Sequence, residues 1–317
     1  MLKRITMASA ILLSMAVMPH AHAATISVNC GGHEGYTSVN AAIKALANWN
    51  IGGANVINVR GVCNENVVFQ GVTHITLDGG NNATIMDLSG GASAAILIYS
   101  SQEIAIKNLT ASGTGQGSGG SDVIDCGNGS ICRFTNVTVQ NASGGGGIAA
   151  FTGSYMEVEG GTVQNNKGWG GVIAINGGRA TIIGTVSRGN WAGAVVSHAS
   201  SMVLVSVSLT GNYLWGMGVI GGASVTCGGC TISGNGTATG GDGVNVRNSS
   251  NVSLNGSTSV TGNGGAGVSL TNLSGLAFDN GAPSVTGNLG AADVVCNPSY
   301  TTVTLNNAQV GTMSGCP

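Results

Sequence analysis

The sequence predicts an all-β fold, a single-stranded parallel β-helix of about ten coils, and three observations lead there. A short pattern recurs about six times between Gly147 and Asn288, and each copy holds three strands of three to five residues. Gly, Asn and Ser separate these strands, whereas hairpins would place strands in pairs joined by two-residue turns. The third observation is a steady period of about 24 residues, so each strand stacks on its equivalent one coil earlier. The first strand of successive repeats is expected to begin at Ile148, Val172, Val195, Val219, Val244 and Val268.

The repeats also predict what fills the coil. Val, Ile and Leu occupy the inward positions, and stacking buries them in continuous columns. Most repeats close their third strand with Asn, which tolerates a left-handed backbone and can bond its own copy in the next coil. We therefore expect an internal ladder through Asn190, Asn212, Asn235, Asn263 and Asn288.

Two kinds of segment carry a family resemblance. Segments such as Ser-Leu-Thr-Gly-Asn at 208–212, and strands such as Gly-Val-Asn-Val at 243–246, resemble the right-handed parallel β-helix of the pectin-lyase-like superfamily. The likeness covers nearly all of the chain after its leader. It implies a right-handed coil but no single activity, because that superfamily includes lyases, hydrolases, esterases, epimerases, phage spikes and adhesins.

The first 23 residues read as a signal peptide. Lys3 and Arg4 precede an apolar run from Met7 to Met18, and Ala21-His22-Ala23 has the form of a signal peptidase site. The run is shorter than the roughly 20 residues of a membrane span, and no second such run follows. We expect residues 24–317 to form one secreted or periplasmic domain without a membrane span.

Both ends of that domain are expected to be closed. Residues 24–53 should form an N-terminal cap, with a strand that ends at Cys30 and one amphipathic helix whose N-cap is Thr37 or Ser38. Gly52-Gly53 would end the helix, and residues 294–317 would close the C-terminal end. Such a helix covers the apolar end of the first coil. Its apolar face would hold Val39, Ala42, Ile43, Leu46 and Trp49.

Charge and cysteine content narrow the function classes. Ten Lys and Arg, of which Lys3 and Arg4 lie in the leader, stand against 12 Asp and Glu, so the domain has no basic footprint for nucleic acid. An even count of eight Cys in an exported chain favours disulfides. No metal or cofactor is expected. The expected pairs are Cys30–Cys63, Cys126–Cys132, Cys227–Cys230 and Cys296–Cys316.

Acidic residues are too sparse for an obvious active site. Glycoside cleavage needs two carboxyl groups roughly 5–9.5 Å apart, and Asp122 and Asp125 form the one close acidic pair on a first strand. Counting three residues from each strand start predicts an outward column of Phe151, Ile175, His198, Gly222, Arg247 and Thr271. At about 4.8 Å per coil, His198 and Arg247 would lie too far apart for one proton transfer. The catalytic candidates are Asp122, Asp125, His198 and Arg247, on a face better suited to contact. Motifs of polygalacturonases, alginate epimerases and pectate lyases are not found.

The most specific surface feature is aromatic. Trp169, Trp191 and Trp215 each stand just before a first strand, with Tyr213 beside the last, and their spacing predicts one column on a turn edge. The column is a stack that stabilises the turns, a platform for the apolar faces of sugar rings, or a protein contact.

Three function hypotheses follow. The leading one is an exported, non-catalytic β-helix protein whose turn edge or first-strand face contacts polysaccharide or another surface polymer. The second is a polysaccharide lyase or glycoside hydrolase with a divergent active site near Asp125 and His198. The third is a structural or adhesin-like surface protein. The sequence leaves the oligomeric state open.

Overall fold

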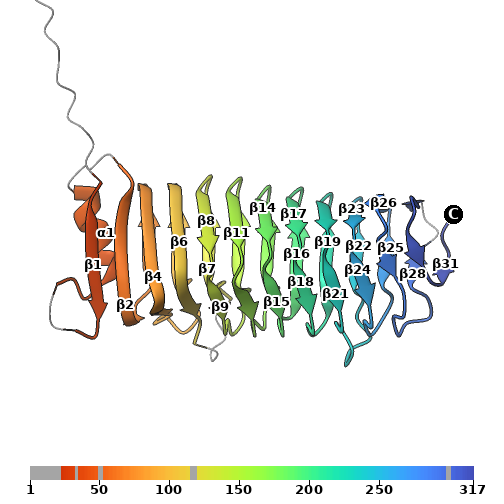
Figure 1. Ribbon diagram of the computed structural model, residues 1–317, viewed down its shortest axis with the longest axis horizontal. Helices are drawn as coiled ribbons and strands as arrows, with labels where there is room; N and C mark the ends of the chain where they lie inside the picture. The colour runs from red at the N-terminus through yellow and green to blue at the C-terminus, as the bar shows by residue number, and fades with distance from the viewer. Residues whose placement is uncertain (1–22, 33–34, 49–52, 115–119, 298–300) are drawn as a thin grey trace, which may run out of the picture.

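The computed structural model describes residues 23–32, 35–48, 53–114, 120–297 and 301–317. Figure 1 shows an elongated coil that winds along one axis from the helix at the N-terminal end to the C-terminus. Its strands form two parallel sheets along that axis, one of eleven strands and one of 20. The predicted all-β parallel β-helix of about ten coils is therefore confirmed.

The eleven-strand sheet contains the first strand of each coil. The short length of these strands follows from the Gly-rich turns on both sides. They are β3 (Val67–Gln70), β5 (Ile96–Tyr99), β7 (Ile124–Gly127), β10 (Ile148–Phe151), β13 (Val172–Ile175), β16 (Ala192–Ser197), β19 (Trp215–Ile220), β22 (Val244–Arg247), β25 (Val268–Thr271), β28 (Val294–Cys296) and β31 (Met313–Ser314).

The 20-strand sheet contains the remaining strands. Early coils use long strands, namely β1 (Thr25–Cys30), β2 (Asn55–Asn64), β4 (Thr73–Met86) and β6 (Gln102–Ser112). Later coils have a separate second strand, in β8 (Ile131–Thr135), β11 (Tyr155–Glu159), β14 (Arg179–Ile183), β17 (Ser201–Val205), β20 (Ser224–Gly228), β23 (Asn251–Gly256), β26 (Gly275–Gly281) and β29 (Thr302–Thr304). Their third strands are β9 (Thr138–Gln140), β12 (Thr162–Gln164), β15 (Val186–Arg188), β18 (Ser208–Thr210), β21 (Thr231–Ser233), β24 (Ser259–Thr261), β27 (Ser284–Val285) and β30 (Gln309–Val310).

Alternation along each strand fills the interior with apolar side chains. In β14 and β17, for example, Ile182 and Leu204 are buried and in register, while their neighbours face outward. Each such buried side chain contributes about 1.5–3 kcal/mol to folding. The buried side chains of each coil therefore pack on those of the next coil along the whole β-helix.

The Asn ladder is confirmed and is longer than predicted. In each step the backbone N–H and the side-chain amide of one Asn donate to Oδ1 of the Asn one coil later, as from Asn190 to Asn212 at 3.0 and 3.3 Å. The ladder starts at Asn166 and ends on the carboxylate of Asp293. A second ladder, which the sequence analysis missed, links Ser101, Ser130 and Ser154 through backbone N–H to hydroxyl bonds.

The N-terminal lid is also confirmed. Helix α1 (Val39–Asn48) buries Val39, Ala42, Ile43 and Leu46, and Ser38 accepts the N–H of Ala41 as its N-cap. Trp49 and Gly52 lie outside the described residues. So does the predicted signal peptide, apart from Ala23.

All four predicted disulfides are present: Cys30–Cys63, Cys126–Cys132, Cys227–Cys230 and Cys296–Cys316. The first joins β1 to β2 beside the lid, and the last ties the C-terminal segment to β28. Within the described residues, no helix has the length and apolarity that crossing a membrane requires.

A candidate ligand groove

An apolar groove of about 670 Å³ lies on the outer side of the eleven-strand sheet. Strands β13, β16 and β19 supply its floor, and its aromatic walls come from the turns that precede β13 and β16 and from the first residue of β19. The apolar strand face and the Trp-bearing edge, which the sequence presented as two separate surfaces, belong to this one site. We call it the groove; its lining is Gly120, Asp122, Gly168, Trp169, Ile173, Ile175, Trp191, Val195, Ser197, His198, Trp215 and Ile220.

The floor consists of outward side chains of neighbouring strands in register. Ile173 of β13 pairs with Val195 of β16, and Ile175 pairs with Ser197. Because alternate residues of a strand face the same side, these two columns run parallel to the coil axis. In β19 the register places Gly218 beside Val195. A Cβ on Gly218 would meet the Trp215 ring at 3.1 Å, so the glycine leaves room for that indole.

The aromatic walls differ in their surroundings. Trp169 is the most exposed, at 67%, and Trp191 is 39% exposed. Trp191 faces Tyr213 with ring centroids 5.0 Å apart and planes tilted by 32°. The guanidinium carbon of Arg247 lies 5.0 Å from the centre of the Trp215 ring. The three indoles therefore have different surroundings. Trp191 packs against Tyr213, Trp215 lies under the Arg247 guanidinium, and Trp169 is largely exposed.

The predicted single column of tryptophans is wrong, although all three line the groove. Trp215 is in register with Ala192, and the backbone N–H of Leu214 donates to the carbonyl of Trp191. The turns between the Asn ladder and the next first strand differ in length. Trp191 consequently stacks on Tyr213 instead of on Trp215.

The predicted outward column is also corrected at two positions. Phe151, Ile175, Arg247 and Thr271 do share a register, but Ser197 and Ile220 fill the places assigned to His198 and Gly222. The first strands align at Ala194 and Met217, not at Val195 and Val219. His198 lies in the turn after β16 with a left-handed backbone (φ 55°), where its Nδ1 is 3.0 Å from the Ser197 hydroxyl.

Asp125 belongs to the neighbouring column and is paired with Ala149. Its carboxyl group nonetheless lies close enough to that of Asp122 for the charge of one to affect the other. Burial, together with the charge and hydrogen bond of Asp122, raises the pKa of Asp125 to about 8. Burial also raises the pKa of Asp122, although the N–H of Gly146 and the bond to Asp125 oppose that rise. Asp125 thus holds its proton at neutral pH, beside a second carboxyl group whose pKa is also raised.

Arg247 stands beside the groove within a polar network. Its Nε donates to Oδ1 of Asn245, and the Asn245 amide donates to Asp242 at 2.8 Å. Asp242 in turn accepts the backbone N–H of Ala266 in the next coil at 3.0 Å. Asp122 accepts the N–H of Gly146 in the same way. Both aspartates therefore link one coil to the next through a hydrogen bond. The Asp122 carboxylate thus has a structural role.

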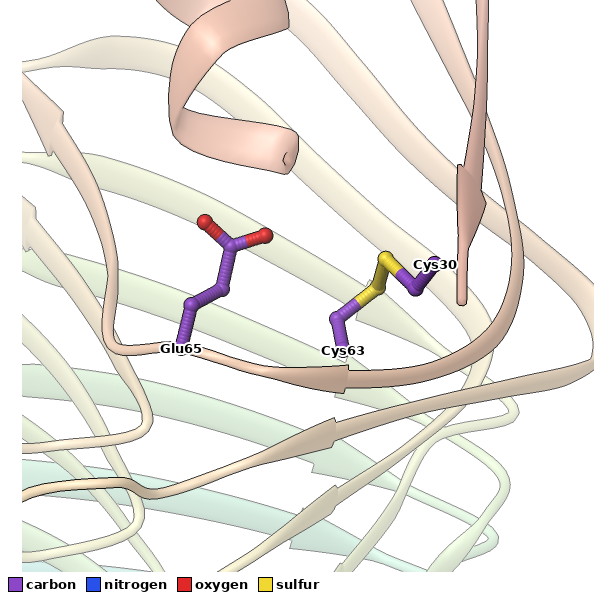
Figure 2. Close-up of side chains that lie close together, drawn as sticks. All are labelled: Cys30, Cys63 and Glu65. Carbon is purple, nitrogen blue, oxygen red and sulfur yellow. A yellow bond between two sulfur atoms is a disulfide. The ribbon is translucent and has the colours of Figure 1, made fainter. Parts of the chain in front are cut away.

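One cluster resembles a metal site by composition. Figure 2 shows Cys30, Cys63 and Glu65 beneath the start of α1, with the two sulfurs bonded to each other. A disulfide has no thiolate to offer a metal. Glu65 instead accepts the N–H groups of Val39 and Asn40, at 2.6 and 3.3 Å, so it caps the lid helix.

No protein-family model matches the chain, and no curated protein sequence matches it either. Among solved structures, the A-module of a mannuronan C-5 epimerase from Azotobacter vinelandii is similar with a TM-score of 0.61. That pair shares 16% sequence identity over 88% of this chain and 92% of that one. ORF18 of Geobacillus virus E2 has a TM-score of 0.53 and 14% identity, over 90% of this chain and 63% of that one. These similarities confirm the right-handed parallel β-helix, and at such identities they concern the fold alone.

Proposed function

We propose that this chain is an exported, non-catalytic β-helix protein that binds polysaccharide in the groove. The observation that carries the proposal is the set of indoles at the walls of an apolar floor that follows the coil axis. Apolar faces of sugar rings pack on exposed aromatic rings, and a floor that crosses several coils suits a linear polymer.

Two further observations support the proposal. Four disulfides fit a chain that folds in an oxidising compartment, outside the cytoplasm. The epimerase module with the same fold is named for its action on a mannuronan, a polysaccharide. We therefore place this protein in the periplasm or outside the cell.

Binding without turnover fits the carboxyl groups better than hydrolysis does. A glycosidase needs room for a water or a sugar carbon between its two carboxyl groups, which are roughly 5–9.5 Å apart. Asp122 accepts the backbone N–H of Gly146, and Oδ1 of Asp125 is buried away from solvent. A carboxylate that bonds the backbone, next to a carboxyl oxygen that solvent does not reach, does not suit that division of roles.

A second function has one observation in its favour. The pKa of Asp125, at about 8, lies in the range that suits a general acid near neutral pH. Asp122 lines the groove, so a lyase or hydrolase that uses this proton is the alternative.

One experiment separates the two functions. A panel of soluble polysaccharides is titrated into the protein by calorimetry, and the same mixtures are assayed for new reducing ends and for unsaturated products. Binding without product, lost in Trp191→Ala, supports the proposal. Product formation that disappears in Asp125→Ala would establish the enzyme instead. A chain that binds no polysaccharide, and that Trp191→Asp converts from a dimer to a monomer, would show the groove to be an interface between copies.

A further inference from the structure

The groove has an unusual charge for a polysaccharide site. Among its lining residues, all of which the structure describes, there is no lysine or arginine, and Asp122 is the one carboxylate. Resting on the function proposed above, we propose that the groove selects an uncharged glycan, recognised through its ring faces and its apolar substituents.

The cations close to the groove are engaged or placed elsewhere. Arg247 lies over the Trp215 ring and donates to Asn245. Arg188 donates to Gln164 within the 20-strand sheet, away from the groove. Lys167 is exposed beside Gly168 but is not part of the lining. His198, in the turn after β16, is the remaining basic side chain of the lining, and one such group cannot match a charge on every sugar.

An acidic polysaccharide would bring a carboxylate onto the aliphatic floor at each sugar. Ile173, Ile175 and Val195 offer no hydrogen-bond donor to such a group. Burying an ionised carboxylate without a partner costs several kcal/mol. Any negative charge that Asp122 and Asp125 share would add repulsion at their end of the groove. The groove therefore discriminates against anionic polymers.

The same floor favours apolar groups. Ile220 continues the column of Ile175 and Ser197, and Ile173 pairs with Val195 beside it, so the floor is apolar apart from the Ser197 hydroxyl. Methyl ester, acetyl or deoxy-sugar methyl groups would pack on this floor while the ring faces contact Trp169 and Trp191. Each buried methyl group contributes about 0.8 kcal/mol. Substituted neutral glycans should consequently bind more tightly than unsubstituted ones.

A matched pair of ligands tests the inference. Homogalacturonan is prepared in fully methyl-esterified and fully de-esterified forms, which differ in charge and in one methyl group per sugar. Binding is measured by calorimetry and by tryptophan fluorescence. Uncharged oligosaccharides of N-acetylglucosamine and of xylose are added so that the outcome does not depend on one backbone. We expect the uncharged forms to bind at least about tenfold more tightly, with affinity nearly constant between about 50 and 500 mM NaCl.

A variant that adds a positive charge to the groove provides a more decisive test. Ile175→Lys places a cation on the floor and leaves all three indoles in the sequence, and it should raise the affinity for de-esterified homogalacturonan at least about tenfold at low salt. Val203→Lys, on an exposed position of β17 in the other sheet, is the matched control and should change neither affinity.

The outcomes keep the two proposals apart. If the native protein prefers the de-esterified polymer, with affinity that falls as salt rises, the inference is wrong while the groove remains a glycan site. If no glycan of either kind binds, and Trp191→Ala changes nothing, the proposed function itself fails. Equal affinity for both polymers would also overturn the selectivity.

Discussion

The guanidinium carbon of Arg247 lies 5.0 Å from the centre of the Trp215 ring, across the boundary between β22 and β19. The Asn245 side chain holds Nε of this arginine, and Asp242 holds Asn245. A chain of polar contacts thus fixes an indole that forms one wall of the groove. The positive charge of Arg247 therefore contacts groups of the protein itself, the Trp215 ring and the Asn245 side chain, and is less available to a ligand.

Replacement of Arg247 should therefore act through Trp215. Arg247→Ala removes a cation–π contact worth about 0.5–1 kcal/mol, so glycan affinity should fall roughly two- to fivefold. Tryptophan emission should shift to longer wavelength as the ring gains exposure. Arg247→Lys retains a cation over the ring and should restore most of both signals. If the alanine variant lost affinity only for acidic polymers, the arginine would be contacting the ligand directly.

The Asn ladder should be the most sensitive polar feature of the interior. Asn212→Ala leaves the buried backbone N–H of Asn190 without its acceptor, whereas the Asn190 side-chain amide keeps the Val163 carbonyl and the Ser187 hydroxyl. A buried unsatisfied group costs about 1–3 kcal/mol, so the free energy of unfolding should fall by about that amount. Urea denaturation measures this loss. Asn82→Ala, at an exposed position of β4, should change the midpoint little. Equal effects at the two sites would mean that the ladder contributes no more than any surface amide.

The lid should depend on Glu65. Its carboxylate accepts two backbone N–H groups of α1 and the Ser38 hydroxyl. Glu65→Ala should cost about 1–2 kcal/mol, as for other lost N-terminal caps, and the amides of residues 39–48 should exchange roughly tenfold faster. Hydrogen exchange read by mass spectrometry localises the effect. Glu103→Ala, which removes an exposed partner of Arg133, is the control. Faster exchange across the later coils as well would argue against a local cap.

The sequence predicted the interior much better than the surface. Inward positions repeat because each coil packs on the last, so period, Asn ladder and disulfide pairs could be read directly. Turn lengths are under no such constraint. Six residues separate Asn166 from Val172, four separate Asn190 from Ala194 and five separate Asn212 from Met217, although these strand positions align. A fixed count consequently misplaced His198 by one residue and treated the three Trp as equivalent.

The groove itself was not predictable by counting. The first-strand face and the Trp edge were each identified, but their union depends on indoles that lie beside the strand face, with Gly218 leaving space for one of them. Glu65 was missed because it caps a helix some 26 residues earlier in the chain. The Ser ladder had a visible signal, since Ser130 and Ser154 recur at the repeat period.

The carboxyl pair makes the stability of the protein depend on pH in a direction opposite to that of a salt-bridged acid. The pKa of Asp125 is about 8 in the folded chain, above the value near 3.9 of an unfolded Asp. The folded state therefore binds the proton more tightly, and this contribution is complete below about pH 4 and is lost progressively as pH rises to 8. Asp125→Asn keeps a donor toward Asp122 and removes the titration. Its melting temperature should match the native value at about pH 4 and exceed it by several degrees at pH 9. Glu159→Gln, an exposed acid on β11, should leave the native pH profile unchanged. A native profile that is already flat between pH 5 and 9 would show that Asp125 does not hold its proton, and the alternative of a general acid in the groove would fail with it.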